Sequence, residues 1–147
     1  MDDAYYMTLA MEEAKKAALE DEVPIGCVIV KDDQIIAQTH NLKEHLKKTT
    51  AHAEILAIEQ ANAALGSWHL DDCTLYVTLE PCMMCTGAIV QSRIKRVVIG
   101  APDSRWPGMT HLLEAFTYNH TIQIDFSTLG TKCAMLLSAY FKKKRKH

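Results

Sequence analysis

One apolar segment constrains the fold of this chain more than any other. The run PIGCVIV (24–30) is continuously apolar, is opened by a proline, and contains four β-branched residues. A short apolar run of this kind is typical of a strand that is buried on both faces, because a half-exposed strand would alternate with polar residues. The chain must therefore supply helices or other layers to cover both faces of the sheet to which this strand belongs.

The segments that follow predict the rest of the sheet. The turn KDDQ (31–34) leads into IIAQTHN (35–41), so these residues form a hairpin with the first strand. Further strands are predicted at CTLYVTL (73–79), RVVIG (96–100) and TIQID (121–125), and helices over residues 4–19, 52–65, 83–92, 109–116 and 131–143. Polar loops are expected over 42–50 and 101–108. The order predicts an α/β fold with a mixed five-stranded sheet covered by helices on both faces.

Length and composition narrow the class of protein. A chain of 147 residues suits a single domain, 1–147. No apolar run is long enough to span a membrane, and the acidic, amphipathic N-terminus is unlike a signal peptide. We therefore expect a cytoplasmic protein whose five cysteines stay reduced.

Two segments carry the residue types that metal chemistry needs. TTAHAEILAI (49–58) places His52 at an expected helix start, and PCMMC (81–85) places Cys82 and Cys85 at another. Unpaired N–H groups and the helix dipole favour thiolates at such a position. If the two helix starts meet at one edge of the sheet, they supply three ligands to a tetrahedral zinc. The fourth position stays open for water, as in catalytic zinc sites.

The neighbouring residues fit this placement. Thr49 and Thr50 are possible caps of the first helix, and Pro81 is favoured in the first turn of the second. Glu54 need not bind the metal. Zinc lowers the pKa of water from about 15.7 to about 7, and a carboxylate beside that water can take its proton and pass it on.

The Cys-x-x-Cys pair has two other interpretations. A Cys-x-x-Cys pair can be a redox pair, but redox pairs usually open the first helix of a thioredoxin-like unit, and this pair lies in mid-chain. The pair could also be half of a structural zinc ribbon, but that site needs a second Cys-x-x-Cys, which the sequence lacks. Cys27, Cys73 and Cys133 lie in or beside apolar segments and are interpreted as core thiols. The joint presence of HAE and PCMMC favours the catalytic zinc site.

The pattern H-x-E…P-C-x-x-C is the signature of zinc-dependent nucleobase deaminases. Nearly the whole chain resembles one family of that class, the bacterial tRNA adenosine deaminases. The resemblance is carried by EVPIGCVIV, TAHAEILAI, TLYVTLEPCMMCTGAIVQSRIKRVVIGA, HN at 40–41 and NH at 119–120. It implies the three-layer α/β/α sandwich of the cytidine deaminase-like superfamily, one zinc ion per chain and a homodimer.

The resemblance also implies roles for single residues. His52, Cys82 and Cys85 would bind zinc, Glu54 would shuttle the proton, and Asn41 would hydrogen-bond the substrate nucleoside. The reaction would convert the wobble adenosine of a tRNA anticodon to inosine with release of ammonia. The target base must be splayed out of its loop, and this costs little free energy because the anticodon loop is single-stranded.

Four further residues are candidate substrate contacts. Val28 could line the pocket or simply belong to the core, and Ala53 lies inside the HAE triplet. Trp106 could stack on a base or cover a helix. His120 could contact RNA or a pocket wall, or act as a surface or capping residue.

Two loops depart from the family. The segment APDSRWPGMTHLLEAF (101–116) has WPGM where the family usually has a glycine-rich turn ending in serine, and KEHLKK (43–48) replaces the more usual Asp-Pro. Because we expect these loops to shape the mouth of the site, a second substrate class stays open: a free base or nucleoside of guanine, cytosine or pterin type. A third hypothesis, a zinc module without turnover, has no use for Glu54.

The C-terminus carries a local charge. YFKKKRKH contains five consecutive basic residues, Lys142 to Lys146. Such a run is either a frayed, solvated terminus or an arm that attracts phosphates. The arm favours a tRNA substrate, whereas the net charge of −2 favours a small molecule.

Overall fold

The computed structural model describes residues 1–116, 118 and 120–145 of the chain, so Asn119 and Lys146 of the sequence predictions lie outside the described residues. The elements are α1 (Asp3–Leu19), β1 (Gly26–Lys31), β2 (Gln34–His40), α2 (Lys43–Leu46), α3 (Ala53–Leu65), β3 (Cys73–Leu79), α4 (Met83–Ser92), β4 (Arg96–Ala101), α5 (Met109–Ala115), β5 (Gln123–Phe126) and α6 (Gly130–Arg145).

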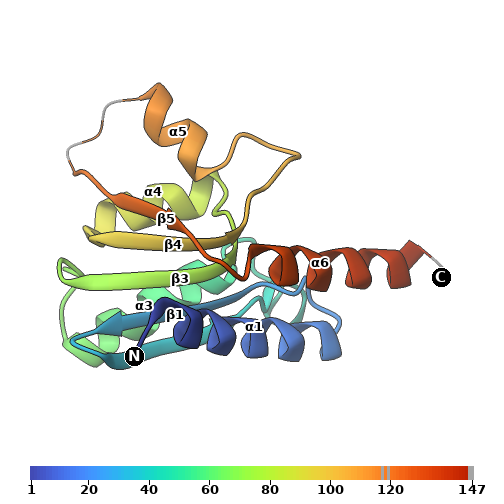
Figure 1. Ribbon diagram of the computed structural model, residues 1–147. Coiled ribbons are helices and arrows are strands. Elements are labelled where there is room, and N and C mark those ends of the chain that lie inside the picture. Colours follow the sequence, from blue (N-terminus) through green and yellow to red (C-terminus); the bar gives the residue numbers. More distant parts are fainter. Residues whose placement is uncertain (117, 119, 146–147) are drawn as a thin grey trace.

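The sheet is mixed and has five strands, as predicted. Its order is β2-β1-β3-β4-β5 (Figure 1). β1 is antiparallel to β2 and to β3, whereas β3, β4 and β5 run parallel. The β1–β2 hairpin turns through Asp32 and Asp33, whose φ angles of 51° and 60° are of the kind that Asp tolerates better than bulkier residues.

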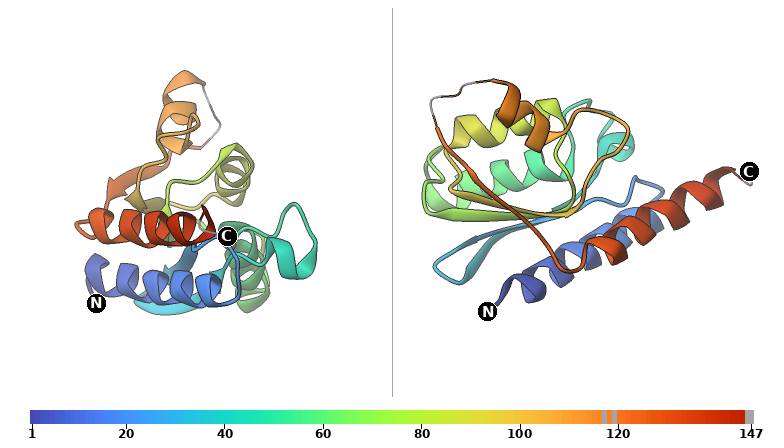
Figure 2. Two further views of the ribbon diagram at one scale, coloured as in Figure 1. Left: turned by 90° about the vertical axis from the view of Figure 1, so that its right-hand side faces the viewer. Right: turned by 45° about the horizontal axis from the view of Figure 1, so that its top comes forward.

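Helices cover both faces of the sheet. α1 and α6 lie side by side on one face, and α3 and α4 cover the other (Figures 1 and 2). β1 shows why its pattern is apolar throughout: Cys27 and Ile29 pack in the cluster under α3 and α4, whereas Val28 and Val30 pack under α1. The predicted α/β/α sandwich is confirmed.

One close approach fixes how α1 sits on the sheet. A Cβ atom added to Gly26 would lie 1.8 Å from the backbone oxygen of Ala10 in α1. Only a residue without a side chain lets the helix backbone come this near to β1.

Three local predictions need correction. The segment 42–50, expected to be a loop, contains the short helix α2. None of the residues of α2 is buried, so the sequence shows no helical spacing of apolar residues there. β1 begins at Gly26, two residues after the predicted Pro24. Lys142 to Arg145 are not frayed, because they form the last turn of α6. Among the described residues, no helix has the length and apolarity that crossing a membrane requires.

Candidate active site

The first part of the site is the start of α3. His52 is the N-cap residue, with extended backbone, and α3 begins at Ala53. Thr49 and Thr50, the predicted caps, do not cap the helix. The N–H of Ala53 donates instead to Oδ1 of Asn41, at 2.8 Å. The residue that ends the hairpin thus satisfies the start of the helix and fixes the position of His52 relative to β2.

The second part is the start of α4. Cys82 is the N-cap residue, and Cys85 lies in the first turn. Pro81 stands one residue before the cap and so lies just outside the first turn of the helix, in which it was expected. Because β3 ends at Leu79, three residues before Cys82, the strand delivers both thiols to the edge of the sheet where α3 begins.

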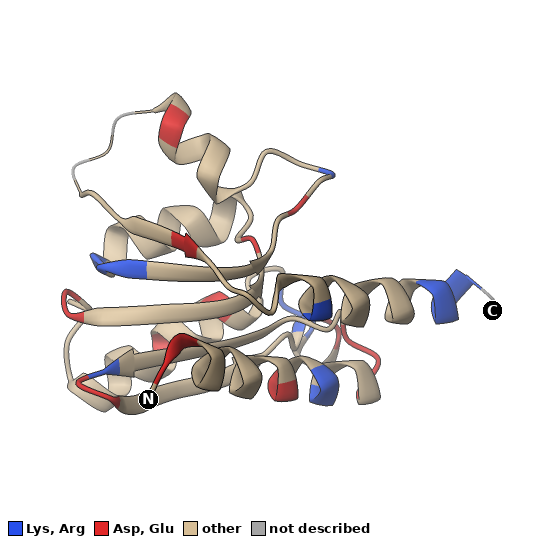
Figure 3. Cartoon of the chain, in the orientation of Figure 1, with Lys and Arg blue, Asp and Glu red and all other residues tan. Residues whose placement is uncertain are grey.

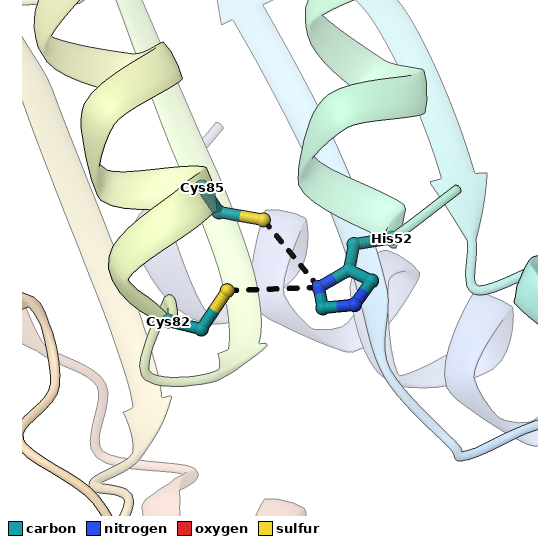
Figure 4. A group of neighbouring side chains, drawn as sticks. All are labelled: His52, Cys82 and Cys85. Carbon is teal, nitrogen blue, oxygen red and sulfur yellow. Dashed lines mark hydrogen bonds between the residues drawn. The ribbon is translucent and has the colours of Figure 1, made fainter. Parts of the chain in front are cut away.

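The two helix starts bring three ligand atoms together (Figure 4). Nδ1 of His52 lies 3.7 Å from Sγ of Cys82 and 3.6 Å from Sγ of Cys85, and all three atoms lie within 4.8 Å of one another. A tetrahedral zinc with usual bond lengths holds a nitrogen and a sulfur about 3.6 Å apart. The donor set and its spacing therefore fit zinc, and no other such cluster exists among the described residues.

Glu54 completes this group. Its side chain is buried, and Oε1 has no hydrogen-bond partner within the described part of the chain. Burial raises the pKa of Glu54 to about 7. A buried polar atom without a partner costs free energy, so it needs an explanation such as a catalytic role. A carboxyl group that titrates near neutral pH beside a metal cluster is suited to carry a proton.

Hydrogen bonds join the two thiols and the imidazole to one another. Hydrogen bonds from the thiol of Cys85 and from His52 stabilise the thiolate of Cys82 and lower its pKa to about 4. The same hydrogen bond raises the pKa of Cys85, and the bond to Cys82 raises the pKa of His52. Zinc binds cysteine as thiolate, so metal binding displaces these protons.

A small cavity opens beside the cluster. Its volume is about 270 Å³, and Cys82, Met83, Trp106 and Leu112 are among the residues that line it. The indole of Trp106 is 70% exposed. The loop between β4 and α5 therefore forms one wall of the opening that leads to Cys82. We call the 102–108 loop, together with the 42–50 loop that precedes His52, the mouth; only the 102–108 loop lines this cavity.

The structure separates the other predicted contacts. Asn41 and Ala53 lie at the cluster, and Trp106 lies at its opening. Val28 is fully buried in the cluster under α1, on the opposite face of the sheet from α3, so it belongs to the core. His120 lies at the far end of the sheet, where Nε2 is 2.8 Å from the backbone oxygen of Ile94, just before β4.

Sequence reasoning missed Glu80. This residue directly follows β3 and is 5% exposed, and its carboxylate accepts hydrogen bonds from Asp103 and Thr110. The one available signal was a charged residue between a buried strand and the PC of the zinc motif.

The sandwich, the His-Cys-Cys cluster and the buried glutamate define a hydrolytic deaminase. Residues 1–145 match the model of the MafB19-like deaminase family, and the chain belongs to that family. It is similar to proteins named tRNA-specific adenosine deaminase. The one from Bacillus subtilis is 46% identical, over 98% of this chain and 91% of that protein. The one from Aquifex aeolicus is 43% identical, over 99% and 97%.

Solved structures show the same fold. A structure from a study of A-to-I editing by tRNA:A34 deaminases at the wobble position has a TM-score of 0.86 and 39% identity. The match covers 91% of this chain and 99% of that one. A guanine deaminase from Bacillus subtilis has a TM-score of 0.67 and 31% identity, over 100% of this chain and 96% of that one.

Proposed function

We propose that this chain is a zinc-dependent deaminase that converts the wobble adenosine of a tRNA anticodon to inosine and releases ammonia. The observation that carries the chemistry is the buried carboxylate of Glu54, with one unpartnered oxygen, next to the three converging side chains of His52, Cys82 and Cys85. The similarity to proteins named tRNA-specific adenosine deaminase supports the substrate.

The residues of the chain divide the work. His52, Cys82 and Cys85 hold the metal, and zinc, when bound, lowers the pKa of water and so supplies the nucleophile at neutral pH. Glu54 accepts the proton of the water that attacks C6 of adenine. It gives this proton to a ring nitrogen, then takes the remaining proton from the hydroxyl group that has formed on C6. It gives that second proton to the amine as the C6–N bond breaks, so that ammonia leaves and C6 becomes a carbonyl. A pKa raised to about 7 by burial lets one carboxyl group both take and give protons near neutral pH.

Asn41 orients the nucleoside. Because the N–H of Ala53 can only donate, the Asn41 atom that it meets must be the amide oxygen. This contact fixes the orientation of the amide and leaves its NH₂ group without a partner among the described residues. That group can donate to an acceptor on the sugar or base of the substrate.

Trp106 and the basic residues suit a nucleic acid. An exposed indole beside the cavity offers a face on which a neighbouring unpaired base can stack. Figure 3 shows Lys and Arg on the last turn of α6 and on the loop between β4 and α5. Arg105 and Arg145 line one groove together with Asp103. The groove that holds Lys144 is lined by three acidic residues, one of which, Asp21, pairs with Lys144. The positive charge is therefore concentrated on the last turn of α6, Lys142 to Arg145, and this turn attracts phosphates although the net charge is −2.

A second candidate is the deamination of a free base. The similarity to a guanine deaminase and the unusual WPGM sequence in the mouth favour it. The basic last turn of α6 is the observation against it, because a neutral base gains little from positive charge.

One experiment separates the two candidates. The protein is incubated with a tRNA that has adenosine at the wobble position, and in parallel with guanine, cytosine and a pterin. We expect inosine in the tRNA, measured by mass spectrometry of the digested RNA, and none with Glu54→Ala. Ammonia release from free bases alone would reject the tRNA substrate.

Three further properties belong to this proposal. We propose one zinc ion per chain, a homodimer and a cytoplasmic location, supported by the fit of the donor set and by the similarity to the family. Elemental analysis of the purified protein measures the zinc, and sedimentation equilibrium measures the mass of the assembly.

A further inference from the structure

Glu80 fixes one of the two loops of the mouth, the 102–108 loop. Glu80 is 5% exposed, and its carboxylate contacts one residue of the loop after β4 and one residue in the first turn of α5. Oε1 accepts the backbone N–H of Asp103 at 3.1 Å, and Oε2 accepts the N–H of Thr110 at 2.8 Å and the hydroxyl of the same residue. One side chain thus ties the beginning of the 102–108 loop to its end.

Among the described residues, few other contacts hold this loop. At its end, Met109 is fully buried in the core cluster, and its backbone N–H donates to the oxygen of Pro81 at 3.1 Å. The guanidinium of Arg105 lies over the ring of Phe141, at 5.9 Å. The hydrogen bonds from Arg105 to Asp103 lie within the loop itself. Glu80 therefore supplies most of the polar contacts that fix the loop to the sheet.

The start of α5 depends on the same carboxylate. The N-cap residue of α5 is Gly108, which has no side chain and makes no capping hydrogen bond. The carboxylate of Glu80 takes the place of that cap by accepting the N–H of Thr110. The fit is tight, because a Cβ on Gly108 would lie 2.5 Å from Cδ of Glu80.

The loop that Glu80 holds is the wall of the cavity. Asp103, Trp106 and Gly108 line the cavity together with Cys82. We infer that Glu80 is a positioning residue for substrate binding, which acts by holding the 102–108 loop and Trp106 in place over the metal cluster. This inference rests on the proposed function for its substrate, and on hydrogen bonds alone for the loop.

The test substitution is Glu80→Gln, which keeps the size of the side chain but replaces one acceptor by a donor. One of the two backbone N–H groups then faces an NH₂ group. We expect the KM for the tRNA, or for an anticodon stem-loop, to rise about tenfold, with kcat within about threefold and the zinc content unchanged. A merely structural role would lower the active fraction, and so kcat, without raising KM.

A second readout needs no activity. Hydrogen exchange of the Asp103 and Thr110 amides reports directly on the two bonds to Glu80 and should become at least about tenfold faster in Glu80→Gln. The matched control is Glu114→Gln, the same chemical change on an exposed residue of α5, where we expect no change in KM or exchange.

Two more variants approach the contact from the other side. Gly108→Ala keeps the charge but pushes the carboxylate aside, so it should reproduce the rise in KM and the faster exchange. Thr110→Val removes the hydroxyl and keeps the N–H, so its effect on KM should be smaller, about two- to threefold. These variants decide the matter if Glu80→Gln does not fold.

Three outcomes would overturn the inference. The first is a KM within twofold of the parent with normal amide protection, and the second is a fall in kcat at unchanged KM. The third is loss of zinc, which would place Glu80 with the metal. If the protein deaminates no tRNA, the proposed function fails, while faster exchange in Glu80→Gln would still establish the role of Glu80 in holding the loop.

Discussion

The metal cluster and the mouth are held in place in different ways. The cluster stands at the starts of α3 and α4, and residues of both helices, such as Ala57 of α3 and Ile89 of α4, are buried in the core cluster on that face of the sheet. The mouth consists of two exposed loops, 42–50 and 102–108, whose described residues contribute little to either core cluster. The chemistry is therefore held by packing and the opening by a few hydrogen bonds, so the opening can change without disturbing the chemistry.

A buried glutamate anchors each side of the mouth. Glu22, which is 1% exposed, accepts the backbone N–H groups of Glu44 and His45, at 3.1 and 2.8 Å, and the ring of His45, at 2.7 Å. Glu80 does the same for α5. The short helices α2 and α5 have no side-chain cap of their own, because their N-cap residues are Leu42 and Gly108. The comparison predicts that substitutions at the cluster remove turnover, whereas substitutions in the mouth change affinity.

The largest effect is expected at the cluster. Cys82→Ala removes one of the three side chains that we propose bind zinc, so the zinc content should fall from about one ion per chain to near zero, and turnover should disappear. Elemental analysis and an ammonia assay measure both. A variant that stays active without metal would contradict the predicted difference between the cluster, which turnover requires, and the mouth, which sets affinity.

The second largest effect is expected at Glu54, the proposed proton carrier. Glu54→Ala should keep the zinc and the fold but lower kcat by about 10²- to 10⁴-fold, because the proton transfer loses its carrier. Inosine formation in single-turnover assays measures the loss. Unchanged turnover would reject the role of Glu54.

Trp106→Ala tests the mouth. Base stacking on an aromatic side chain contributes about 1–3 kcal/mol, so KM for the tRNA should rise about tenfold at constant kcat. Trp68→Ala is the control, because Trp68 is also exposed but lies just before β3, at the other end of the sheet. Equal effects of both substitutions would contradict a stacking role.

A smaller effect is expected from the last turn of α6. Replacing Lys142 and Lys143 by Ala should weaken tRNA binding and reduce the slope of log K against log salt by about 1 for each phosphate contact that is lost. Lys95→Ala, an exposed lysine just before β4, is the matched control. If fluorescence anisotropy gives the same slope for all variants, the basic turn takes no part in binding.

The smallest effect concerns stability and pH. His40, which precedes Asn41, contacts Glu13 at 2.8 Å and Glu20 at 3.0 Å. Burial alone would lower the pKa of His40, but the two carboxylates outweigh it and raise the pKa above 6.5. The contribution to stability is therefore complete below pH 6.5 and is lost as the pH rises through the folded-state pKa. The difference in Tm between the parent and His40→Gln should shrink over that range. A constant difference would show that the charge of His40 plays no part.

Much of the cluster could be predicted from sequence because its patterns are local. His-x-Glu and Cys-x-x-Cys each fit in one helix turn, and the apolar strands place both turns at one edge of the sheet. The contacts of the mouth are not local: Glu80 meets a residue 30 positions away, and Glu22 one 23 away. A single glutamate has no period. The position of Glu80 between a buried strand and the zinc motif is the one signal that sets it apart from exposed glutamates, and Glu22 has no such signal. For the same reason α2, capped from a distance, was predicted as a loop.

The contact between α1 and β1 has a consequence for variation at one codon. Since even a methyl group at position 26 would collide with the carbonyl of Ala10, a library that randomises this codon and selects for folded protein should return glycine almost alone. A helix seated this closely leaves the chain no tolerance there, although the position lies far along the chain from the zinc motif.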